Sequence, residues 1–378
     1  MKIAHVIATF PPHFGGMGQV AFEEAILLAG AGHEVTVFTL RYPDQTYPED
    51  QKLPFKVIRL KPFVKAGDAG FAPQLFWQLL GFDLVHLHYP FYGSAHLVYL
   101  AAKIFGFKYI VTYHMDAVTK GGKKIAQWLA DLVWARAILR GARQVIAVDR
   151  DYFDASRYGR AVRSERVVEL WNGVWTEIFK PGDKNLAVLK LQKFSGKKIL
   201  LFIGNPLPLK RLDLILQAMK IISDPELVLI AVGEGYSLPV YQKLADQLGL
   251  SAQVEFVRGV QFLPTLAEYC RAADATVVPS DSESFSLVAI GSLACGRPVI
   301  GSNIVGLRGR LEQGVDSFLF SPGSAGDLAD KIVKFFALSA EQRQTMGERG
   351  RQKVLRDYTW ENHLQKLEQI YNQATHEV

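Results

Sequence analysis

Short runs of apolar residues alternate with segments of helical periodicity along most of the chain. In the first half, the runs that predict strands are Ile3–Ala8, Glu34–Leu40, Lys56–Leu60, Asp83–Leu87, Lys108–Tyr113, Gln144–Val148 and Val167–Leu170. Helical patterns between them cover Gly18–Ala31, Ser94–Phe105 and Lys123–Arg140. Because the strand runs are continuously apolar rather than alternating, they favour a parallel sheet that is buried on both faces.

A second series of the same kind begins near residue 198. Its predicted strands are Lys198–Ile203, Leu227–Val232, Val254–Val257, Ala275–Val278 and Pro298–Gly301, and its predicted helices are Leu212–Ile222, Tyr236–Leu248, Leu263–Ala272 and Phe285–Ala294. The chain from Asp327 onward has a helical pattern throughout. Two such series predict two doubly wound α/β domains, with a hinge at Phe179–Asp183, where Lys180-Pro181-Gly182 interrupts the pattern.

Composition agrees with a globular protein. The 378 residues are 49% hydrophobic and 21% charged, and no apolar run approaches the ~18 residues of a membrane span. The N-terminal MKIAHVIATF predicts a strand rather than a signal sequence. Two cysteines, Cys270 and Cys295, cannot form a disulfide framework or a four-ligand zinc site. We therefore expect a cytoplasmic location.

The net charge of +6 is concentrated in one stretch. Residues 120–166 hold 11 basic and 5 acidic residues, so the rest of the chain sums to zero. One interpretation is a solvated basic face, and the other is attraction to an anionic partner such as membrane lipid, a phosphorylated acceptor or nucleic acid. Within this stretch, Lys120–Arg143 carries Trp128, Trp134 and cations at both ends. That pattern is typical of an interfacial helix, while a helix buried in the domain core is the alternative.

Glycines and a histidine follow strands of the first series. Gly15 and Gly16 lie between the first strand and its helix, where backbone N–H groups can approach an anion, although a purely structural turn is the alternative. His114 follows the fifth strand, where it could donate a hydrogen bond or move a proton. His86 and His88 share a strand face with each other, but no carboxylate completes a set with His114, so we predict no metal site.

In the second series, Gly204, Asn205, Lys210 and Arg211 follow the first strand. Two adjacent cations at a strand–helix loop can hold a diphosphate, and the loop is not a Walker A motif. After the next strand, Gly233 and Glu234 form a turn that lets a ligand or the backbone approach closely.

The strongest local signal begins at Pro279. A loop presents Glu283, and a helix starts near Phe285, so that backbone N–H groups could bind phosphate while the carboxylate accepts hydrogen bonds from hydroxyls. A helix-capping role for Glu283 is the plain alternative. Asp281-Ser282-Glu283 superficially matches an Asp-x-Asp metal clamp, which the two-domain architecture disfavours.

Together these segments resemble retaining glycosyltransferases of the GT-B fold, specifically glycosyltransferase family 4. The match runs along nearly the whole chain and includes Gly15-Gly16, Gly32-His33-Glu34-Val35, His114, Asn172-Gly173-Val174, Gly204 with Lys210, Gly233-Glu234-Gly235 and Pro279-Ser280 through Glu283 to Ala294-Cys295-Gly296-Arg297-Pro298-Val299. The resemblance implies two Rossmann-like domains that face each other across a cleft. The acceptor domain would cover 1–179, the donor domain 180–359, and a last helix over 360–378 would pack back on the acceptor domain.

The resemblance also implies a mechanism. Lys210 would neutralise charge on the leaving diphosphate, Glu283 would hold hydroxyls of the donor sugar, and His114 would lie beside the sugar. Backbone groups of Phe285, Ser286, Leu287 and Val288 would contact sugar and phosphate, and Gly15 and Gly16 would leave room for the donor phosphate and the acceptor. The co-substrate would be a UDP-, GDP- or ADP-sugar, with no metal or other cofactor. The acceptor would be a lipid-linked molecule or a saccharide in glycolipid, polysaccharide or glycoconjugate synthesis, with peripheral contact at the inner face of the membrane through 120–166 and no nucleic-acid partner.

Three positions depart from the family pattern. Gly291 replaces a second glutamate that usually holds the nucleotide ribose, Asn205 replaces an arginine, and Trp175 replaces an aspartate. Arg211 could supply the missing cation. The alternative function is therefore a degenerate GT-B protein that binds a ligand or a partner without transferring a sugar.

Overall fold

The computed structural model describes the chain except residues 14, 43–45, 117–133, 185–189, 261 and 377–378. By its internal contacts the chain divides into two units. Unit 1 comprises residues 1–172 and 361–378, and unit 2 comprises residues 173–360. None of the helices in the described residues combines the length and apolar character that a membrane-spanning helix needs.

Unit 1 is built on a seven-stranded sheet in which every pairing is parallel. Its order is β3 (Lys56–Leu60), β2 (Glu34–Leu40), β1 (Lys2–Val6), β6 (Leu84–Tyr89), β7 (Tyr109–Tyr113), β8 (Val145–Ala147) and β9 (Val167–Glu169). A separate antiparallel hairpin pairs β4 (Val64–Ala66) with β5 (Ala69–Phe71). The strand order reverses at β1, which has β2 on one side and β6 on the other.

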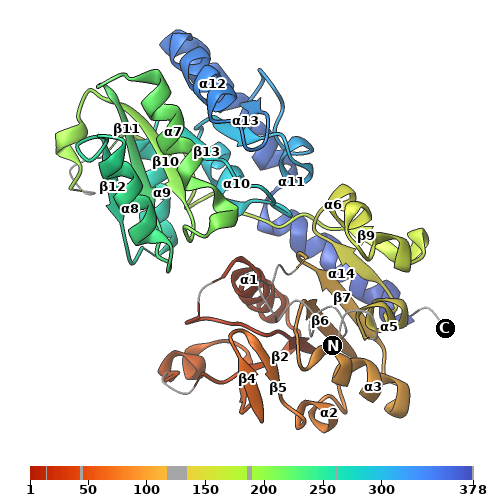
Figure 1. Cartoon of the computed structure of the whole chain (residues 1–378). Coiled ribbons are helices and arrows are strands. Elements are labelled where there is room, and N and C mark those ends of the chain that lie inside the picture. The colour runs from red at the N-terminus through yellow and green to blue at the C-terminus, as the bar shows by residue number, and fades with distance from the viewer. Residues whose placement is uncertain (14, 43–45, 117–133, 185–189, 261, 377–378) are drawn as a thin grey trace. The chain divides into compact units, whose positions relative to one another are not determined.

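Helices cover both faces of this sheet (Figure 1). α1 (Gly16–Gly30) and α14 (Trp360–His376) bury their apolar stripes in one core, with Ile3, Val37 and Ile110 from the sheet. The opposite core contains side chains of α2 (Leu75–Gln78), α3 (Ala95–Phe105), α5 (Arg136–Gly141) and α6 (Arg150–Ala155). Because the central strands β1, β2, β6 and β7 are buried on both faces, their continuous apolar runs in the sequence have a direct physical cause.

Unit 2 repeats the architecture with a six-stranded parallel sheet. The order is β12 (Val254–Val257), β11 (Leu227–Val232), β10 (Lys198–Ile203), β13 (Ala275–Val278), β14 (Val299–Ser302) and β15 (Ser317–Phe320). Its helices are α7 (Leu212–Ile222), α8 (Leu238–Gln247), α9 (Leu263–Ala272), α10 (Leu287–Ala294), α11 (Val305–Arg308), α12 (Ala325–Ala337) and α13 (Ala340–Asp357). The order again reverses at the first strand, here β10.

The sequence predicted most of these elements. The bounds of β2, β3, β10, β11, β12, β13, α7 and α9 agree to the residue. The prediction missed β15 and the β4–β5 hairpin, which are three or four residues long and lie among polar and glycine residues. Most of the helix predicted over Lys123–Arg140 lies outside the described residues. We expected a division at 179/180 and a last helix over 360–378 that packs back on the first domain. The internal contacts divide the chain at 172/173 and group residues 361–378 with unit 1.

Helix α14 is held to unit 1 by polar contacts as well as by its apolar face. His363 donates from Nδ1 to the carbonyl oxygen of Trp171 at 2.7 Å, and its Nε2 lies 3.1 Å from Oε1 of Glu24 on α1. The Tyr371 hydroxyl lies 2.7 Å from His86 Nδ1. A helix that follows unit 2 in the chain thus completes the core of unit 1.

Truncating Leu367 to alanine is expected to destabilise the protein by about 2–5 kcal/mol. Leu367 is fully buried in the core that α1 and α14 share, and removing its methyl groups leaves a cavity that the packed surroundings fill only in part. Equilibrium urea unfolding of Leu367→Ala measures this. Gln365→Ala, at an exposed position of the same helix, is the control and should change stability by less than about 0.5 kcal/mol. Equal midpoints for the two variants would contradict the role assigned to α14.

Candidate active site

The loops after β10 and β13 meet because the two strands are neighbours in the sheet. Parallel strands end at the same edge, and a doubly wound sheet opens a crevice where the strand order reverses. Here Lys210 Nζ donates to Glu283 Oε1 at 2.6 Å, and Ser280 Oγ donates to the same oxygen at 2.7 Å. The side chains of Lys210 and Glu283 keep 29% and 13% of their surface exposed. A ligand can therefore reach both partners of the pair.

Arg211 follows Lys210 in the left-handed conformation, with φ of 50°. Its guanidinium is 3.0 Å from Asp213 Oδ2 and donates to Asp281 Oδ1, also at 3.0 Å. The pKa of Arg211 is raised, first because of its hydrogen bonds to Asp213. Two carboxylates thus compensate the charge that we expected to be available for a donor phosphate.

The same contacts bear on the Asp281-Ser282-Glu283 triplet. Asp281 is bound to Arg211, and Glu283 is bound to Lys210. Each carboxylate already has its own cationic partner, which argues against the two acting as a joint metal clamp.

Glycines bring the backbone of neighbouring loops into direct contact. A Cβ on Gly233 would lie 1.9 Å from the carbonyl oxygen of Gly204, and Gly204 itself has a φ of +144°. Asn205 and Glu234, the residues that follow these glycines, are exposed. Only glycine permits the approach of the β10 and β11 loops, so these glycines have a structural role whatever they bind.

The start of α10 is shaped by Ser286. This residue has a φ of +69°, and its hydroxyl caps the helix by accepting from the Ala289 N–H at 3.4 Å. The N–H groups of Leu287 and Val288 lie in the first turn, where no intrahelical acceptor exists. Phe285 is buried, with its ring centroid 4.7 Å from the Arg310 guanidinium carbon. Phe285 therefore fixes the loop by packing, whereas the backbone after it is available to an anion.

An aromatic ring packs at the position where the family resemblance implies a second glutamate. A Cβ on Gly291 would approach the ring of Phe179 to 3.3 Å, so an aromatic ring packs against the face of α10 where the family carries a carboxylate. The neighbouring Ser292 is fully buried and donates to Thr276 Oγ1 at 2.7 Å. Ser292 therefore does not supply the lost polar group to a ligand.

In unit 1, the predicted residues lie at the carboxyl edge of the sheet, after β1 and β7. Gly15 caps α1 with extended backbone (φ of −175°), Gly16 is its first residue, and both are exposed. A Cβ on either glycine would meet no atom within 4 Å. Neither the conformation nor the packing among the described residues therefore requires glycine at these two positions.

His114 is almost fully buried, and its Nε2 lies 2.9 Å from His88 Nδ1. Burial lowers the pKa of His114 to about 4, although the nearby Glu24 acts in the opposite direction. At neutral pH this imidazole is therefore uncharged and can donate one hydrogen bond and accept another.

The expectation that no carboxylate accompanies the histidines was wrong. Glu24 on α1 lies among His5, His86 and His88. The sequence carries a signal for it, because Glu24 is three residues from Ala21 and four from Leu28, both in the apolar stripe of α1. An acid on the core-facing stripe of a helix requires a buried partner.

Comparisons with known proteins identify the architecture. The glycosyl transferases group 1 profile matches residues 183–353, and the glycosyl transferase 4-like domain profile matches residues 15–173. D-inositol 3-phosphate glycosyltransferase of Mycobacterium tuberculosis H37Rv is 30% identical over 387 aligned residues, which cover 95% of this chain and 79% of that protein.

Solved structures share the fold. Sucrose-phosphate synthase of Thermosynechococcus elongatus superposes with a TM-score of 0.83 at 24% identity, covering 99% of this chain and 98% of its own. Anabaena HepE in complex with UDP-glucose gives a TM-score of 0.83 at 18% identity, covering 99% and 100%. The fold is GT-B, and the class is that of the glycosyltransferases. This chain belongs to the glycosyl transferases group 1 family, and it is a glycosyltransferase.

Gly306→Ala is expected to lower the rate of sugar transfer by about 100-fold. A Cβ at Gly306 would lie 1.9 Å from the carbonyl oxygen of Glu283, so the loop that carries Glu283 must move, and a displacement of about 1 Å at a reacting group costs on the order of 100-fold. Steady-state transfer assays measure the effect. Gly309→Ala, where a Cβ meets nothing within 4 Å, is the matched control and should retain the wild-type rate. A normal rate for Gly306→Ala would show that the position of Glu283 is immaterial.

Proposed function

We propose that this enzyme transfers a sugar from a nucleotide-sugar donor to an acceptor with retention of the anomeric configuration, and that no metal takes part at the reacting centre. Unit 2 binds the donor and unit 1 binds the acceptor. The observation that carries the proposal is the exposed Lys210–Glu283 pair at the reversal point of the second sheet. HepE was solved with UDP-glucose, and starch synthase IV of Arabidopsis thaliana with ADP and acarbose, which supports a nucleotide-linked donor and leaves its base open.

Lys210 is the cation for the leaving diphosphate. Arg211 is held by Asp213 and Asp281. Lys210 is paired with the carboxylate of Glu283, and the diphosphate of a donor can replace that carboxylate. A diphosphate that bound Lys210 would release Glu283, and the ammonium would then offset the negative charge that grows on the leaving group. This electrostatic stabilisation performs the role that a metal ion has in other transferases.

Glu283, once released, accepts hydrogen bonds from hydroxyls of the donor sugar. Ser280, which donates to Glu283 Oε1 at 2.7 Å, keeps the carboxylate oriented during that exchange. The backbone N–H groups of Leu287 and Val288 at the start of α10 bind the adjacent phosphate. Gly204, Asn205, Gly233 and Glu234 line the same edge of the sheet and complete the donor site.

Unit 1 contributes His114, Gly15 and Gly16. A neutral imidazole at the carboxyl end of β7 donates a hydrogen bond to the sugar without adding charge to the site. The open space over the two glycines admits the donor phosphate and the acceptor oxygen. In the retaining reaction, that oxygen attacks on the face from which the diphosphate leaves.

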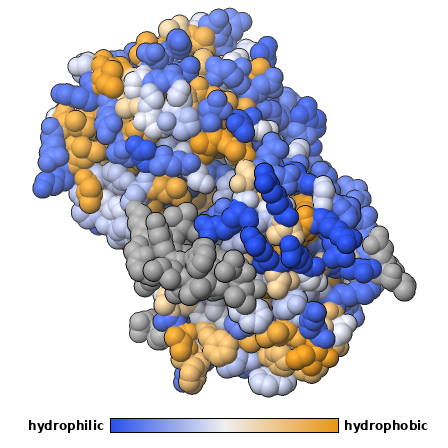
Figure 2. All heavy atoms as spheres, turned by 45° about the vertical axis from the view of Figure 1, so that its right-hand side comes forward, coloured by the Kyte–Doolittle hydropathy of each residue, from blue (hydrophilic) through white to orange (hydrophobic). Residues whose placement is uncertain are grey.

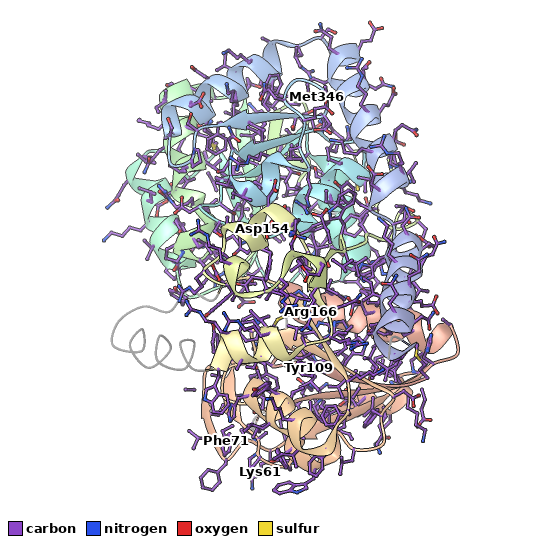
Figure 3. All side chains as sticks on the ribbon, turned by 90° about the vertical axis from the view of Figure 1, so that its right-hand side faces the viewer. Lys61, Phe71, Tyr109, Asp154, Arg166 and Met346 are labelled. Atoms are coloured by element: carbon purple, nitrogen blue, oxygen red, sulfur yellow. The ribbon has the colours of Figure 1, made fainter. Side chains whose placement is uncertain are left out.

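The acceptor is a lipid-linked molecule or a saccharide. A basic surface of unit 1 supports contact of the protein with the inner face of an anionic membrane. The described residues 134–166 hold eight arginines and four carboxylates. Arg136, Arg140, Arg157, Arg160, Arg163 and Arg166 are exposed. Figure 2 shows strongly hydrophilic side chains on the surface of unit 1, and Figure 3 labels Asp154 and Arg166 on the yellow segment between α5 and β9. Residues 120–133, the rest of the predicted interfacial helix, lie outside the described residues.

One observation favours the alternative of a degenerate protein that binds without transferring. Phe179 packs against Gly291, so α10 offers no carboxylate to a nucleotide ribose. A lost charge-assisted hydrogen bond costs about 1.5–3 kcal/mol, which lowers donor affinity by roughly 10- to 150-fold unless backbone groups compensate. The retained Lys210–Glu283 pair favours the enzyme.

Lys210→Ala and Glu283→Ala are each expected to reduce transfer by at least about 1000-fold while leaving the fold intact. The first removes the cation at the leaving group, and the second removes the acceptor for the sugar hydroxyls. Transfer is measured with a panel of UDP-, GDP- and ADP-sugars, using donor hydrolysis as the readout where the acceptor is unknown. Lys220→Ala, an exposed lysine on α7, is the control. Unchanged activity in either site variant would refute the assignment.

Isothermal calorimetry with the same nucleotides separates the enzyme from its alternative. Binding of one nucleotide class with turnover supports the transferase, and binding without turnover supports the degenerate protein. If no UDP, GDP or ADP derivative binds, the donor site itself is wrong. Because Gly291→Glu would force a side chain into the Phe179 contact, that variant is expected to destabilise the protein rather than to improve nucleotide binding.

The double variant Arg160→Ala/Arg163→Ala is expected to bind anionic vesicles at least tenfold more weakly than the wild type. Each cation near an anionic surface contributes about 1 kcal/mol. Sedimentation with vesicles that contain 30% phosphatidylserine measures the partitioning, and vesicles of phosphatidylcholine alone give the baseline. Lys220→Ala/Lys243→Ala, two exposed cations of unit 2, is the control. If the wild type partitions equally to both kinds of vesicle, the basic stretch is a solvated face with no role in membrane binding.

A further inference from the structure

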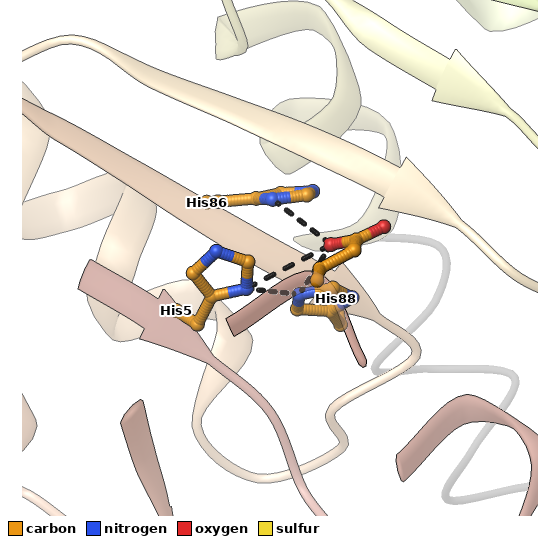
Figure 4. A group of neighbouring side chains, drawn as sticks. His5, His86 and His88 are labelled. Atoms are coloured by element: carbon orange, nitrogen blue, oxygen red, sulfur yellow. Dashed lines mark hydrogen bonds and ion pairs between the residues drawn. The ribbon is translucent and has the colours of Figure 1, made fainter. Parts of the chain in front are cut away.

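Unit 1 contains a cluster of four buried groups whose chemistry the transfer reaction does not use. His5 on β1, His86 and His88 on β6, and Glu24 on α1 are each at most 1% exposed. Figure 4 shows the three imidazoles gathered around the carboxylate. Among the described residues, one ligand atom from each of the four lies within 4.8 Å of the others.

The topology of the sheet brings these residues together. In the parallel pairing of β1 with β6, His5 is opposite His86. Side chains alternate along a strand, so His88 projects from the same face as His86. That face is covered by α1, whose core-facing stripe includes Glu24. Three rigid elements therefore fix the cluster, and it does not depend on a loop.

One carboxylate oxygen is the centre of the cluster. Glu24 Oε2 is 3.8 Å from His5 Nδ1, 3.7 Å from His86 Nδ1 and 3.7 Å from His88 Nε2. Oε2 is buried and has no hydrogen-bond partner among the described residues, whereas Oε1 faces His363. A buried ionised oxygen without a donor is costly, and it requires a cation or a proton.

The spacing fits a small divalent cation. Tetrahedral nitrogen and oxygen ligands with bonds of about 2.0–2.2 Å lie about 3.3–3.6 Å from one another. The three distances from Glu24 Oε2, 3.7–3.8 Å, lie just above this range. His5 Nδ1 and His88 Nε2, at 2.9 Å, would move apart to reach this range. The four ligand atoms lie within 4.8 Å of one another, so binding would also draw the most widely separated pair together by about 1 Å through rotation of the side chains.

The outer nitrogen of each ring is already held. The three contacts are His5 Nε2 to the Tyr371 hydroxyl at 3.2 Å, His86 Nε2 to Thr112 Oγ1 at 2.6 Å and His88 Nδ1 to His114 Nε2 at 2.9 Å. Metal-bound histidines have this arrangement, because a partner on the outer nitrogen fixes the proton there and leaves the inner nitrogen with its lone pair. The Tyr371 hydroxyl also contacts His86 Nδ1 at 2.7 Å, and that contact would be exchanged for the metal.

We propose that His5, His86, His88 and Glu24 bind one divalent transition-metal ion, of which Zn²⁺ suits three imidazoles and a carboxylate best. The site is closed and structural. It ties α1 to the centre of the sheet and contributes no ligand to the transfer reaction. Metal content is measured without reference to sugar transfer, so the two proposals fail independently.

A bound ion would also determine which ring nitrogen of His114 carries the proton. When His88 Nε2 coordinates the metal, His88 Nδ1 carries the proton and donates it to His114 Nε2. His114 then keeps its own proton on Nδ1. The metal thus acts on His114 through one intervening residue, which makes His88 a positioning residue for the candidate active site.

Metal content tests the proposal directly. The full chain, freed of any affinity tag and dialysed against EDTA and then metal-free buffer, is expected to retain about one equivalent of zinc by inductively coupled plasma mass spectrometry. Protein produced in cobalt-supplemented medium is expected to show the visible d–d absorption of four-coordinate Co²⁺. Wild-type protein with less than about 0.1 equivalent of any transition metal, and no Co²⁺ spectrum, would overturn the proposal.

Variants identify the ligands. Glu24→Gln and His86→Gln are expected to reduce the bound metal at least tenfold, and His96→Gln, a partly buried histidine on α3 outside the cluster, is expected to leave it unchanged. Full metal content in Glu24→Gln would place the ion elsewhere and refute this site. If a ligand variant fails to fold, the wild-type metal analysis and the Co²⁺ spectrum still decide the question.

Discussion

The reversal of strand order at the first strand of each parallel sheet is the constraint on which the rest of the structure depends. In unit 2 it makes β10 a neighbour of both β11 and β13, so that the loops after the three strands share one edge. Lys210 and Glu283, separated by 73 positions in the chain, form an ion pair only for this reason. In unit 1 the same reversal makes β1 a neighbour of β6 and brings His5 opposite His86. One topological rule thus produces a surface site in one unit and a buried cluster in the other.

Close backbone contacts then fix the loops that carry the candidate site residues of unit 2. A Cβ on Gly233 would lie 1.9 Å from the carbonyl oxygen of Gly204, and a Cβ on Gly306 would lie 1.9 Å from that of Glu283, so both positions require glycine. These glycines contribute no functional group, yet they determine where the functional groups lie. Gly291 is a different case, because Phe179 packs against its face of α10. The departure from the family pattern at this position is therefore part of a packed core and not an isolated deletion of charge.

The sequence predicted the architecture and placed the candidate residues directly after strands, for identifiable reasons. Continuous apolar runs located the strands of both sheets, and residues directly after strands proved to be those that meet at the sheet edges. Pattern alone could not show that Arg211 is paired with Asp213 and Asp281, because those contacts depend on side-chain geometry. Glu24 was missed because a single carboxylate in an apolar helix pattern is easily assigned to the solvent face. The division of the chain after Asn172 rather than near Phe179 reflects tertiary contacts, which no local turn signal reports.

The return of α14 to unit 1 has a consequence for synthesis on the ribosome. Residues 361–378 emerge only after all of unit 2, yet Leu367, Ile370 and Tyr371 belong to the core that α1 covers. Until they arrive, a nascent unit 1 exposes the part of this apolar face that α14 covers and leaves Glu24 without the imidazole of His363. Unit 2 can complete its own core in the meantime. The first half of the chain is therefore the last to reach its final state, and its interval of exposure lengthens with the time taken to translate the intervening residues.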